Sequence, residues 1–464
     1  MSLTPPLKVG KLQAALQAKA KRAPSYRFYS LHDKIYREEV LRWAWERCRK
    51  NGGSPGVDGQ SFEQIERAGV AEWLGALGQE LREKSYRAAA VRRVMIPKED
   101  GKTRPLGIPT IRDRVAQMAV VIVLEPIFEA DFPDEQYGYR PGRSAHDAIR
   151  AIHGKLNQGH TEVVDADLSG YFDTIPHHEL MQSLARRISD GAMLALLKMW
   201  LEMPVEITDD RGHKQRTTEN KDTGKGTPQG APISPLLSNL YMRRFVLGWK
   251  KHKGQGHVVA YADDFVILCR SRAEHAREQM EKLMGRLKLK VNAQKTRIAR
   301  VPQESFDFLG YTMGQCYRLN GSQYIGTKPA KKRIAAFCKD ISALTERNSY
   351  WMPVEAKVAE LNSRLRGWGN YFCLGPVSRA YAVVDNHARH RLRQWLNGKH
   401  SSRGKRTRRY AAVYLHQDLG LVSLARTTRN FSWAKSMNHL SESRMRENRP
   451  SGLMRGGRRN GHWS

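Results

Sequence analysis

Val163-Val164-Asp165-Ala166-Asp167-Leu168 and His257-Val258-Val259-Ala260-Tyr261-Ala262-Asp263-Asp264-Phe265-Val266-Ile267-Leu268 are the two stretches of sequence that decide the fold. Side chains alternate between the two faces of a β-strand, so the first stretch places its apolar residues on one face and Asp165 and Asp167 on the other. The second stretch has apolar runs on either side of a short polar tip. This pattern predicts a β-hairpin with Asp263 and Asp264 at its turn.

The adjacent carboxylates indicate a metal site. Neighbouring carboxylates repel each other, and the arrangement is tolerated when a divalent cation lies between them and a third carboxylate. Nucleotidyl transfer needs such a site, because one metal ion activates the primer 3′ oxygen and a second neutralises the triphosphate. Two adjacent aspartates alone fit a solvated hairpin tip equally well, but Tyr261 to Asp264 between two apolar strands is more specific. We therefore predict that Asp263 and Asp264 are catalytic and bind two Mg²⁺ ions together with an aspartate of the first stretch, Asp165 or Asp167.

Further motifs carry a resemblance to a known family. Asp167 to Asp173 and Tyr261 to Asp264 resemble the two carboxylate motifs in the palm of reverse transcriptases. More closely, the chain resembles the reverse transcriptase–maturases encoded by bacterial group II introns, from about Ser54 to about Leu424. The other motifs that carry this resemblance are Ser54 to Gly59 (SPGVDG), Lys102 to Pro109 (KTRPLGIP), Tyr137 to Ser144 (YGYRPGRS), Gly226 to Gly230 (GTPQG) and Phe308 to Tyr311 (FLGY). The resemblance makes Asp167 the metal ligand and Asp165 a neighbour.

The expected fold is α+β: a right-hand polymerase with fingers and palm, followed by an α-helical thumb or maturase domain and a basic C-terminal region. Apolar patterns predict a strand pair over 91–97 and 103–108, a buried helix over 111–128 and a helix over 273–287. We expect four parts. They are a basic N-terminal extension (1–60), the fingers and palm (61–325), the thumb or maturase domain (326–384) and a basic, DNA-binding region (385–464).

The resemblance also implies a nucleotide-binding site. Its expected contacts are Lys98 and Arg104 in the fingers hairpin, Phe172 under the sugar, Gln229 near the templating base and Lys295 as a proton donor to pyrophosphate. Phe172 lies five residues after Asp167 and would exclude a 2′-hydroxyl by steric conflict. Each residue also has a simpler interpretation, as an exposed basic turn, a core aromatic, a common loop or a surface lysine. Tyr171, beside Phe172, is the alternative sugar gate.

The segment from Leu361 to Phe372 combines basic and aromatic residues at helical spacing. Arg364 and Arg366 could pair with phosphates, and Trp368 and Tyr371 could stack on bases. The alternative is that the aromatic residues form the apolar face of a helix with the arginines outward. By resemblance, this segment belongs to the domain that grips the primer–template duplex and binds the parent intron RNA.

Charge and composition restrict the partners. The 464 residues carry 79 basic and 46 acidic side chains, a formal net charge of +33. Such an excess indicates a polyanion, because each cation near a phosphate releases condensed counterions. The first 25 or so residues are expected to form a basic arm that orders only on a partner. Five scattered cysteines favour a reducing compartment, and no apolar run is long enough to span a membrane.

The function expected from the resemblance is an RNA-directed DNA polymerase. It would bind its parent group II intron RNA, assist splicing, and copy the intron during target-primed retrotransposition. Its partners would be intron RNA, RNA template with DNA primer, target DNA and deoxynucleoside triphosphates, in the bacterial cytoplasm and at the nucleoid. One alternative is a host-domesticated relative acting in DNA repair or phage defence, and another is a splicing factor that does not polymerise. No cluster of Cys pairs and His typical of the family's endonuclease appears, so the priming 3′ end is expected from elsewhere, such as a replication fork.

Overall fold

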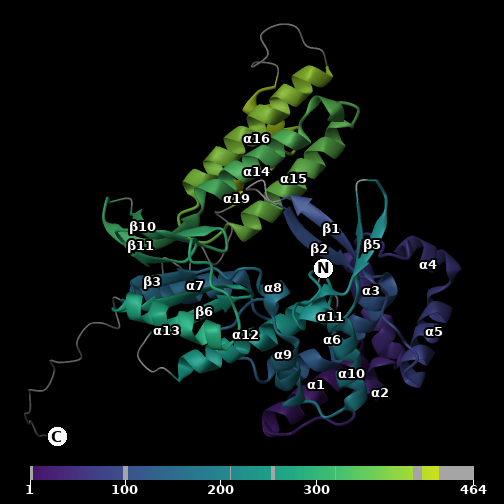
Figure 1. Cartoon of the computed structure of the whole chain (residues 1–464). Helices are drawn as coiled ribbons and strands as arrows, with labels where there is room; N and C mark the ends of the chain where they lie inside the picture. Colours follow the sequence, from purple (N-terminus) through teal and green to yellow (C-terminus); the bar gives the residue numbers. More distant parts are fainter. Residues whose placement is uncertain are drawn as a thin grey trace, which may run out of the picture. The chain divides into compact units, whose positions relative to one another are not determined.

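A computed structural model describes residues 4–97, 103–209, 211–251, 256–318, 320–400 and 410–427 (Figure 1). The chain divides into two compact units, Met1–Leu309 and Gly310–Ser464. This division falls earlier than the expected boundary at 325/326. The reason is that Tyr311 packs within the second unit, with its ring centroid 6.0 Å from that of Tyr371 and 5.2 Å from that of Phe372.

The N-terminal segment is helical and packed, which corrects the expectation of an arm that orders only on a partner. Helix α1 (Leu7–Arg22) buries Val9, Leu16 and Ala20. The Gln13 amide donates a 3.0 Å hydrogen bond to the carbonyl of Ile122 in α6. The basic residues of α1 therefore lie on the exposed side of a helix whose apolar stripe is part of the first unit's core.

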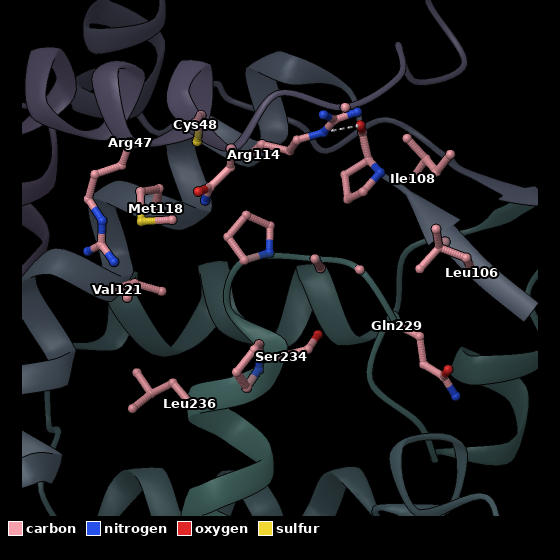
Figure 2. Close-up of a pocket in the computed structure, with 18 of the residues that line it drawn as sticks. Arg47, Cys48, Leu106, Ile108, Arg114, Met118, Val121, Gln229, Ser234 and Leu236 are labelled. Carbon is pink, nitrogen blue, oxygen red and sulfur yellow. Dashed lines mark hydrogen bonds between the residues drawn. The ribbon is translucent and has the colours of Figure 1, made fainter. Parts of the chain in front are cut away.

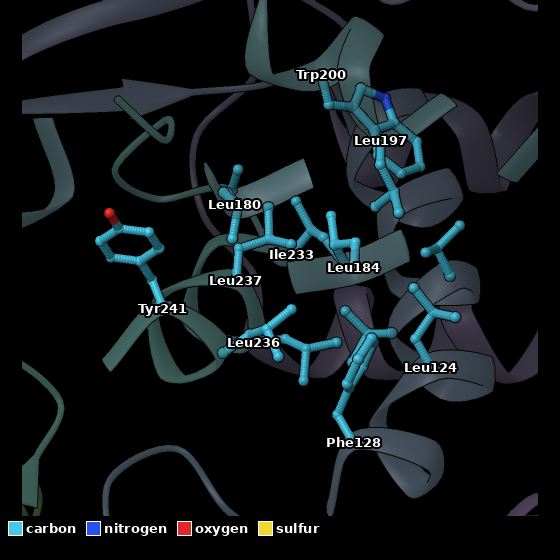
Figure 3. Packing of buried hydrophobic residues seen from close by; sticks show 14 of the residues in the cluster. Leu124, Phe128, Leu180, Leu184, Leu197, Trp200, Ile233, Leu236, Leu237 and Tyr241 are labelled. Carbon is cyan, nitrogen blue, oxygen red and sulfur yellow. The ribbon is translucent and has the colours of Figure 1, made fainter. Parts of the chain in front are cut away.

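Helix α6 (Ile111–Glu129) is the centre of the first unit. Nearly every one of its side chains is buried, as its apolar sequence predicts. Figure 3 shows Leu124 and Phe128 of α6 among leucines and aromatic residues of three further helices. These are α9 (His177–Ala185), α10 (Gly191–Leu201) and α12 (Ser234–Lys250).

The first sheet of this unit has the strand order β2-β1-β4-β5. Strands β1 (Val91–Pro97) and β2 (Thr103–Ile108) form the antiparallel pair that the sequence predicts. Strand β4 (Val205–Thr208) then adds to β1 in parallel, and β5 (Lys214–Thr217) pairs with β4. The β4–β5 hairpin was not predicted, because its short strands gain their order from β1, which is distant in sequence.

The second sheet positions the carboxylates and has the order β6-β7-β3-β8, with every neighbouring pair antiparallel. The central strands β3 (Glu162–Ala166) and β7 (Asp264–Cys269) lie side by side, between β6 (His257–Tyr261) and β8 (Arg297–Arg300). The expected apolar strands are therefore confirmed. Their direction brings the end of β3 next to the turn between β6 and β7.

The remaining elements of the first unit are mostly helices that surround these two sheets. They are α2 (His32–Ile35), α3 (Glu38–Asn51), α4 (Phe62–Ala68), α5 (Val70–Glu83), α7 (Ala145–Asn157), α8 (Tyr171–Thr174), α11 (Glu219–Thr223), α13 (Ala273–Arg286) and β9 (Phe306–Phe308).

The second unit begins with the antiparallel strands β10 (Tyr311–Tyr317) and β11 (Gln323–Pro329). Helices follow: α14 (Lys331–Leu344), the 3₁₀ turn η1 (Arg347–Ser349), α15 (Val354–Tyr371), α16 (Ser378–Lys399), α18 (Ala412–Gln417) and α19 (Leu424–Thr427). Helix α16 runs without a break through the boundary expected at 384/385. No helix among the described residues has both the length and the apolarity to cross a membrane.

Candidate active site

The β6–β7 hairpin presents its carboxylates through a two-residue turn. Tyr261 pairs with Asp264, so Ala262 and Asp263 form the tip. Ala262 has a φ of +58°, a conformation that costs an alanine energy and that the surroundings must hold in place. Gly138 lies against this turn, and a Cβ atom on it would come within 2.4 Å of the Ala262 nitrogen. A glycine is therefore required at 138 for the Tyr137 to Ser144 motif to pack against the hairpin.

The charges around this turn repel one another. The pKa of Asp264 is raised to about 6, by desolvation and then by the negative charges of Asp263, Asp167 and Asp165. The pKa of Asp165 is also raised to about 6, chiefly by burial, although Arg297 lies 3.6 Å from its carboxylate. Asp165 thus has a cationic partner, Arg297, and its place as a neighbour of the metal ligands stays a prediction.

Asp167 follows β3 directly and is held by the segment before β8. The backbone N–H of Asn292 donates to the Asp167 carbonyl at 2.8 Å, and its side-chain amide donates to Asp167 Oδ2 at 3.1 Å. Lys295 Nζ lies 3.5 Å from the same oxygen. The fold therefore brings Lys295 to the carboxylates, and it adds Asn292, which the sequence analysis missed. The sequence feature that could have indicated Asn292 is its position close to Lys295 on the same turn.

The carboxylate oxygens suit a hard divalent cation. Mg²⁺ prefers oxygen ligands, and the excess of negative charge that raises the pKa of Asp264 is what a cation would relieve. In the described part of the chain, no three Asp, Glu, His or Cys side chains already converge as they would around a bound metal ion. The residues present fit the ion by their chemistry, and closing them around it requires side-chain movement.

The two neighbouring aromatic residues have different environments. Tyr171 is buried and its hydroxyl donates to the carbonyl of Ser238 at 2.8 Å. Burial raises the pKa of Tyr171 far above its usual value. Phe172 is also buried, with 7% of its surface exposed, but it lines a cavity. Of the two rings, Phe172 is the one that borders this cavity.

This cavity has a volume of about 770 Å³ and reaches from Gln229 to Arg47 (Figure 2). Figure 2 shows Gln229 at the right of the cavity, Arg114 at the top and Arg47 at the left, where the apolar side chains of Met118, Val121 and Leu236 also lie. A mixed lining of this kind fits a nucleotide, whose base is flat and whose backbone is charged.

Gln229 lies on a loop that is fixed at several points. Its side-chain amide donates to Asp173 Oδ2 at 2.9 Å, and its carbonyl accepts from the backbone N–H of Gly107 at 2.6 Å. His177 Nε2 lies 2.7 Å from the carbonyl of Gly226 at the start of the loop. Asp173 and His177 were missed by the sequence analysis. The sequence feature that could have indicated them is their position, since Asp173 is the last residue of the first carboxylate motif and His177 follows shortly after it.

The fingers hairpin is described only in part. Arg104 is in β2, where its backbone is paired with that of Ile96 in β1. Lys98 lies outside the described residues. Both expected nucleotide contacts therefore remain predictions.

The four residues expected to bind RNA lie on helix α15 of the second unit, and they differ in how exposed they are. Arg364 and Arg366 are exposed. Trp368 is only 9% exposed and stacks on Phe337, with ring centroids 5.1 Å apart and planes 8° apart. Tyr371 is half-buried, with its ring centroid 4.8 Å from that of Phe372. The burial of Trp368 corrects its expected contact with RNA to a packing role, because the face that would stack on a base is already covered.

Comparison with known proteins gives the family. Residues 96–313 match the model of the reverse transcriptase (RNA-dependent DNA polymerase) family, and residues 334–411 match the maturase-specific domain of group II introns. Protein YkfC of Escherichia coli is 33% identical over 72% of this chain and 96% of its own length. The group II intron-encoded protein LtrA of Lactococcus lactis is 28% identical over 75% of this chain and 71% of its own length.

A solved structure, the partial Cas6-RT-Cas1–Cas2 complex, is 27% identical with a TM-score of 0.34, covering 55% of this chain and 41% of its own. That TM-score is too low to carry an argument. The family models and the relatives agree with the carboxylate geometry. The chain belongs to the group II intron-type reverse transcriptases and is an RNA-directed DNA polymerase with a maturase-specific domain.

Proposed function

We propose that the polymerase uses two Mg²⁺ ions held by Asp167, Asp263 and Asp264. The observation that carries this proposal is the crowding of carboxylates at the end of β3 and the β6–β7 turn, where desolvation and then the charges of Asp263, Asp167 and Asp165 raise the pKa of Asp264 to about 6. Members of the reverse transcriptase family use divalent metal ions, which lower the pKa of the primer 3′ hydroxyl and neutralise the triphosphate.

Two side chains next to Asp167 have separate roles in this proposal. Asn292 donates to Oδ2 of Asp167 and would hold this carboxylate in position for the metal ions. Lys295, at 3.5 Å from Oδ2, is mostly exposed and can turn toward the incoming triphosphate. It would then stabilise the pyrophosphate and donate a proton to it as the bond breaks.

The incoming deoxynucleotide would lie between Phe172 and the fingers hairpin. Phe172 would lie under the sugar and exclude a 2′-hydroxyl. Arg104 and Lys98 would meet the triphosphate, and Gln229 would be held by Asp173 beside the new base pair. The cavity that begins at Phe172 and Gln229 would accept the templating nucleotide.

The second unit would bind the parent intron RNA. The exposed Arg364 and Arg366 of α15 are available to bind phosphates. The packed face of the helix fixes the position of the backbone that carries them. The net charge of +33 supports contacts spread over several faces, as the folding of a large RNA requires. In this proposal the protein assists splicing and then copies the intron at a target DNA, which the basic region 385–464 would bind.

The test is a splicing assay with the parent intron at low magnesium, run beside primer extension on an RNA template. Asp167→Asn should stop DNA synthesis and leave splicing intact. The double variant Arg364→Gln, Arg366→Gln should weaken splicing more than synthesis. If the wild-type protein extends primers but does not accelerate splicing, the maturase role is wrong and a host-domesticated polymerase is the better account.

A further inference from the structure

The connection between α14 and α15 carries Trp351, which is 79% exposed and is the most exposed of the large hydrophobic side chains described. The neighbouring Tyr350 points inward, and its ring centroid lies 6.1 Å from that of Trp395 in α16. Hydrophobic side chains that are exposed singly are common on protein surfaces. What distinguishes Trp351 is how firmly the chain around it is held.

Three basic side chains donate hydrogen bonds to the backbone of this connection. Lys399 Nζ donates to the carbonyls of Tyr350 and Met352, at 2.7 and 2.8 Å, so one ammonium group holds the backbone carbonyls of the residues before and after Trp351. Arg391 and Lys357 donate to carbonyls at the end of α14: Ser342, Leu344 and Thr345, at 2.8 to 3.2 Å. Carbonyls at a helix end have no partners from the helix backbone beyond its last turn, so these side chains add donors there.

Further side-chain hydrogen bonds hold the connection between α14 and α15. Ser349 Oγ donates to the carbonyl of Glu346 at 2.7 Å and accepts from Trp395 Nε1 at 2.9 Å. The backbone on both sides of Trp351 is therefore ordered before any ligand arrives. A ligand that contacts the indole avoids most of the entropic cost of ordering a loop.

The charge around Trp351 favours an anionic ligand. Among the described residues, Lys357 has a carboxylate partner, Glu360 at 2.7 Å. In the described part of the chain, the hydrogen-bond partners of Lys399 and Arg391 are all uncharged: backbone carbonyls, the Thr345 hydroxyl and the Gln394 amide. Their N–H groups donate hydrogen bonds, but no acidic partner among these contacts neutralises their positive charges. A positive potential therefore remains at this end of the unit.

The immediate neighbours of Trp351 exclude a large apolar interface. Glu346, Arg347 and Asn348 are exposed and polar, and Met352 is half-buried. A protein partner usually buries a cluster of apolar side chains. A single exposed indole in a polar and positively charged surrounding fits a nucleobase, which offers one flat face and an attached phosphate.

We propose that Trp351 is a stacking platform for an unpaired base of the bound RNA, with the adjoining phosphate attracted by Lys399 and Arg391. Only an unpaired base qualifies, because bases inside an A-form duplex are covered on both faces. This inference rests on the RNA binding proposed above and names one contact within it.

The experiment measures RNA binding by protein that already holds an excess of a blunt RNA–DNA duplex, which occupies the polymerase cleft. The labelled probes are a single-stranded RNA of mixed sequence and a blunt RNA duplex. Trp351→Ala should weaken binding of the single strand about 5- to 100-fold, the range for loss of one stacked base, and leave the duplex unchanged. Trp351→Phe should lose less, because it keeps an aromatic face.

Val383→Ala is the matched control, because Val383 is also in the second unit and is 52% exposed. It should bind both probes like the wild type. The dependence of affinity on salt should be the same for Trp351→Ala and wild type, since stacking releases no counterions. Thermal unfolding of Trp351→Ala should match the wild type, because the indole is not part of the core.

Unchanged single-strand affinity in Trp351→Ala would overturn the proposal and point to a protein partner for the indole. An equal loss on both probes would also overturn it, because a stacking platform discriminates between them. Either result would leave primer extension by the wild-type protein intact. Failure of the wild type to extend a primer or to bind RNA would instead count against the proposed function.

Discussion

The palm carboxylates and helix α15 are two regions that combine polar and aromatic residues, and the fold treats them differently. At the palm, Asp264 is surrounded by other acidic groups, and Phe172, although only 7% exposed, borders a cavity of about 770 Å³. In α15, Trp368 is covered by Phe337 and only the arginines are exposed. A carboxylate whose charge is not neutralised inside the fold is available to a ligand. An aromatic ring that is already packed stabilises the fold instead.

If this contrast is correct, loss of a palm carboxylate should reduce activity without reducing stability. We expect Asp264→Ala to lower the rate of DNA synthesis at least about 1,000-fold, because the metal ions lose a ligand. Single-turnover primer extension measures this, and filter binding should show intact RNA affinity. Asp340→Ala, an exposed aspartate on α14, is the control. Full activity of Asp264→Ala at ordinary magnesium would disprove the active-site assignment.

A change in the packed face of α15 should have the reverse effect. Trp368→Ala should lower the free energy of unfolding by about 3–5 kcal/mol, since it leaves a large cavity against Phe337. Denaturant unfolding, followed by circular dichroism, measures this. A variant that keeps wild-type stability but loses RNA affinity would show that Trp368 does contact RNA.

Substitutions of the two aromatic neighbours, Phe172 and Tyr171, should affect different properties of the protein. Phe172→Ala should raise incorporation of ribonucleotides relative to deoxynucleotides at least about tenfold, because steric exclusion of the 2′-hydroxyl is lost. Tyr171→Phe is the matched control. It removes one buried hydrogen bond, worth about 1 kcal/mol of stability, and should leave the ratio unchanged. A change of the ratio in Tyr171→Phe and not in Phe172→Ala would reverse the assignment.

The exposed arginines of α15 should contribute charge and little stability. Arg364→Gln and Arg366→Gln should each reduce the slope of log affinity against log salt by about 0.7 to 0.9, if each contacts one phosphate. Arg42→Gln makes the same charge change on α3, where Arg42 pairs with Glu38, and serves as the comparison. Slopes identical to that of the wild type would remove α15 from the RNA interface.

The smallest effect concerns the stability of the metal-free protein. The pKa of Asp264 is raised from its usual value to about 6 in the folded state. A raised carboxyl pKa means stability that is present at low pH and is lost as pH rises through about 6. Asp264→Asn should therefore unfold at a higher temperature than the wild type at pH 8 and at the same temperature near pH 4. A lower melting temperature at pH 8 would show that repulsion at the turn is not significant.

Local patterns in the sequence predicted the strands and the turn that form the palm site. Alternation in Val163 to Leu168 and the apolar runs around Asp263 and Asp264 were sufficient, because these segments are buried and their period is that of a strand. The helix over 111–128 was predicted for a similar reason. In both cases the decisive signal lies within one short segment.

The features that were missed depend on partners distant in sequence. Helix α1 is ordered by α6, and the β4–β5 hairpin is ordered by β1. Asn292 and Asp173 act through contacts with Asp167 and Gln229 that no local pattern encodes. Tyr171 and Phe172 could not be distinguished, because the carbonyl of Ser238 that binds Tyr171 is brought there by the fold. Trp351 gave no signal, because the backbone around it is held by cations in α15 and α16, which are distant in sequence.

The most direct test of the account is the binding of Mn²⁺, as a paramagnetic substitute for Mg²⁺, to protein with primer–template and a non-reactive deoxynucleotide analogue. Electron paramagnetic resonance counts the bound ions. The account predicts two bound ions in the wild type, and a weakened or lost ion in each of Asp167→Asn, Asp263→Asn and Asp264→Asn. The same number of ions at the same affinity in these variants would contradict it.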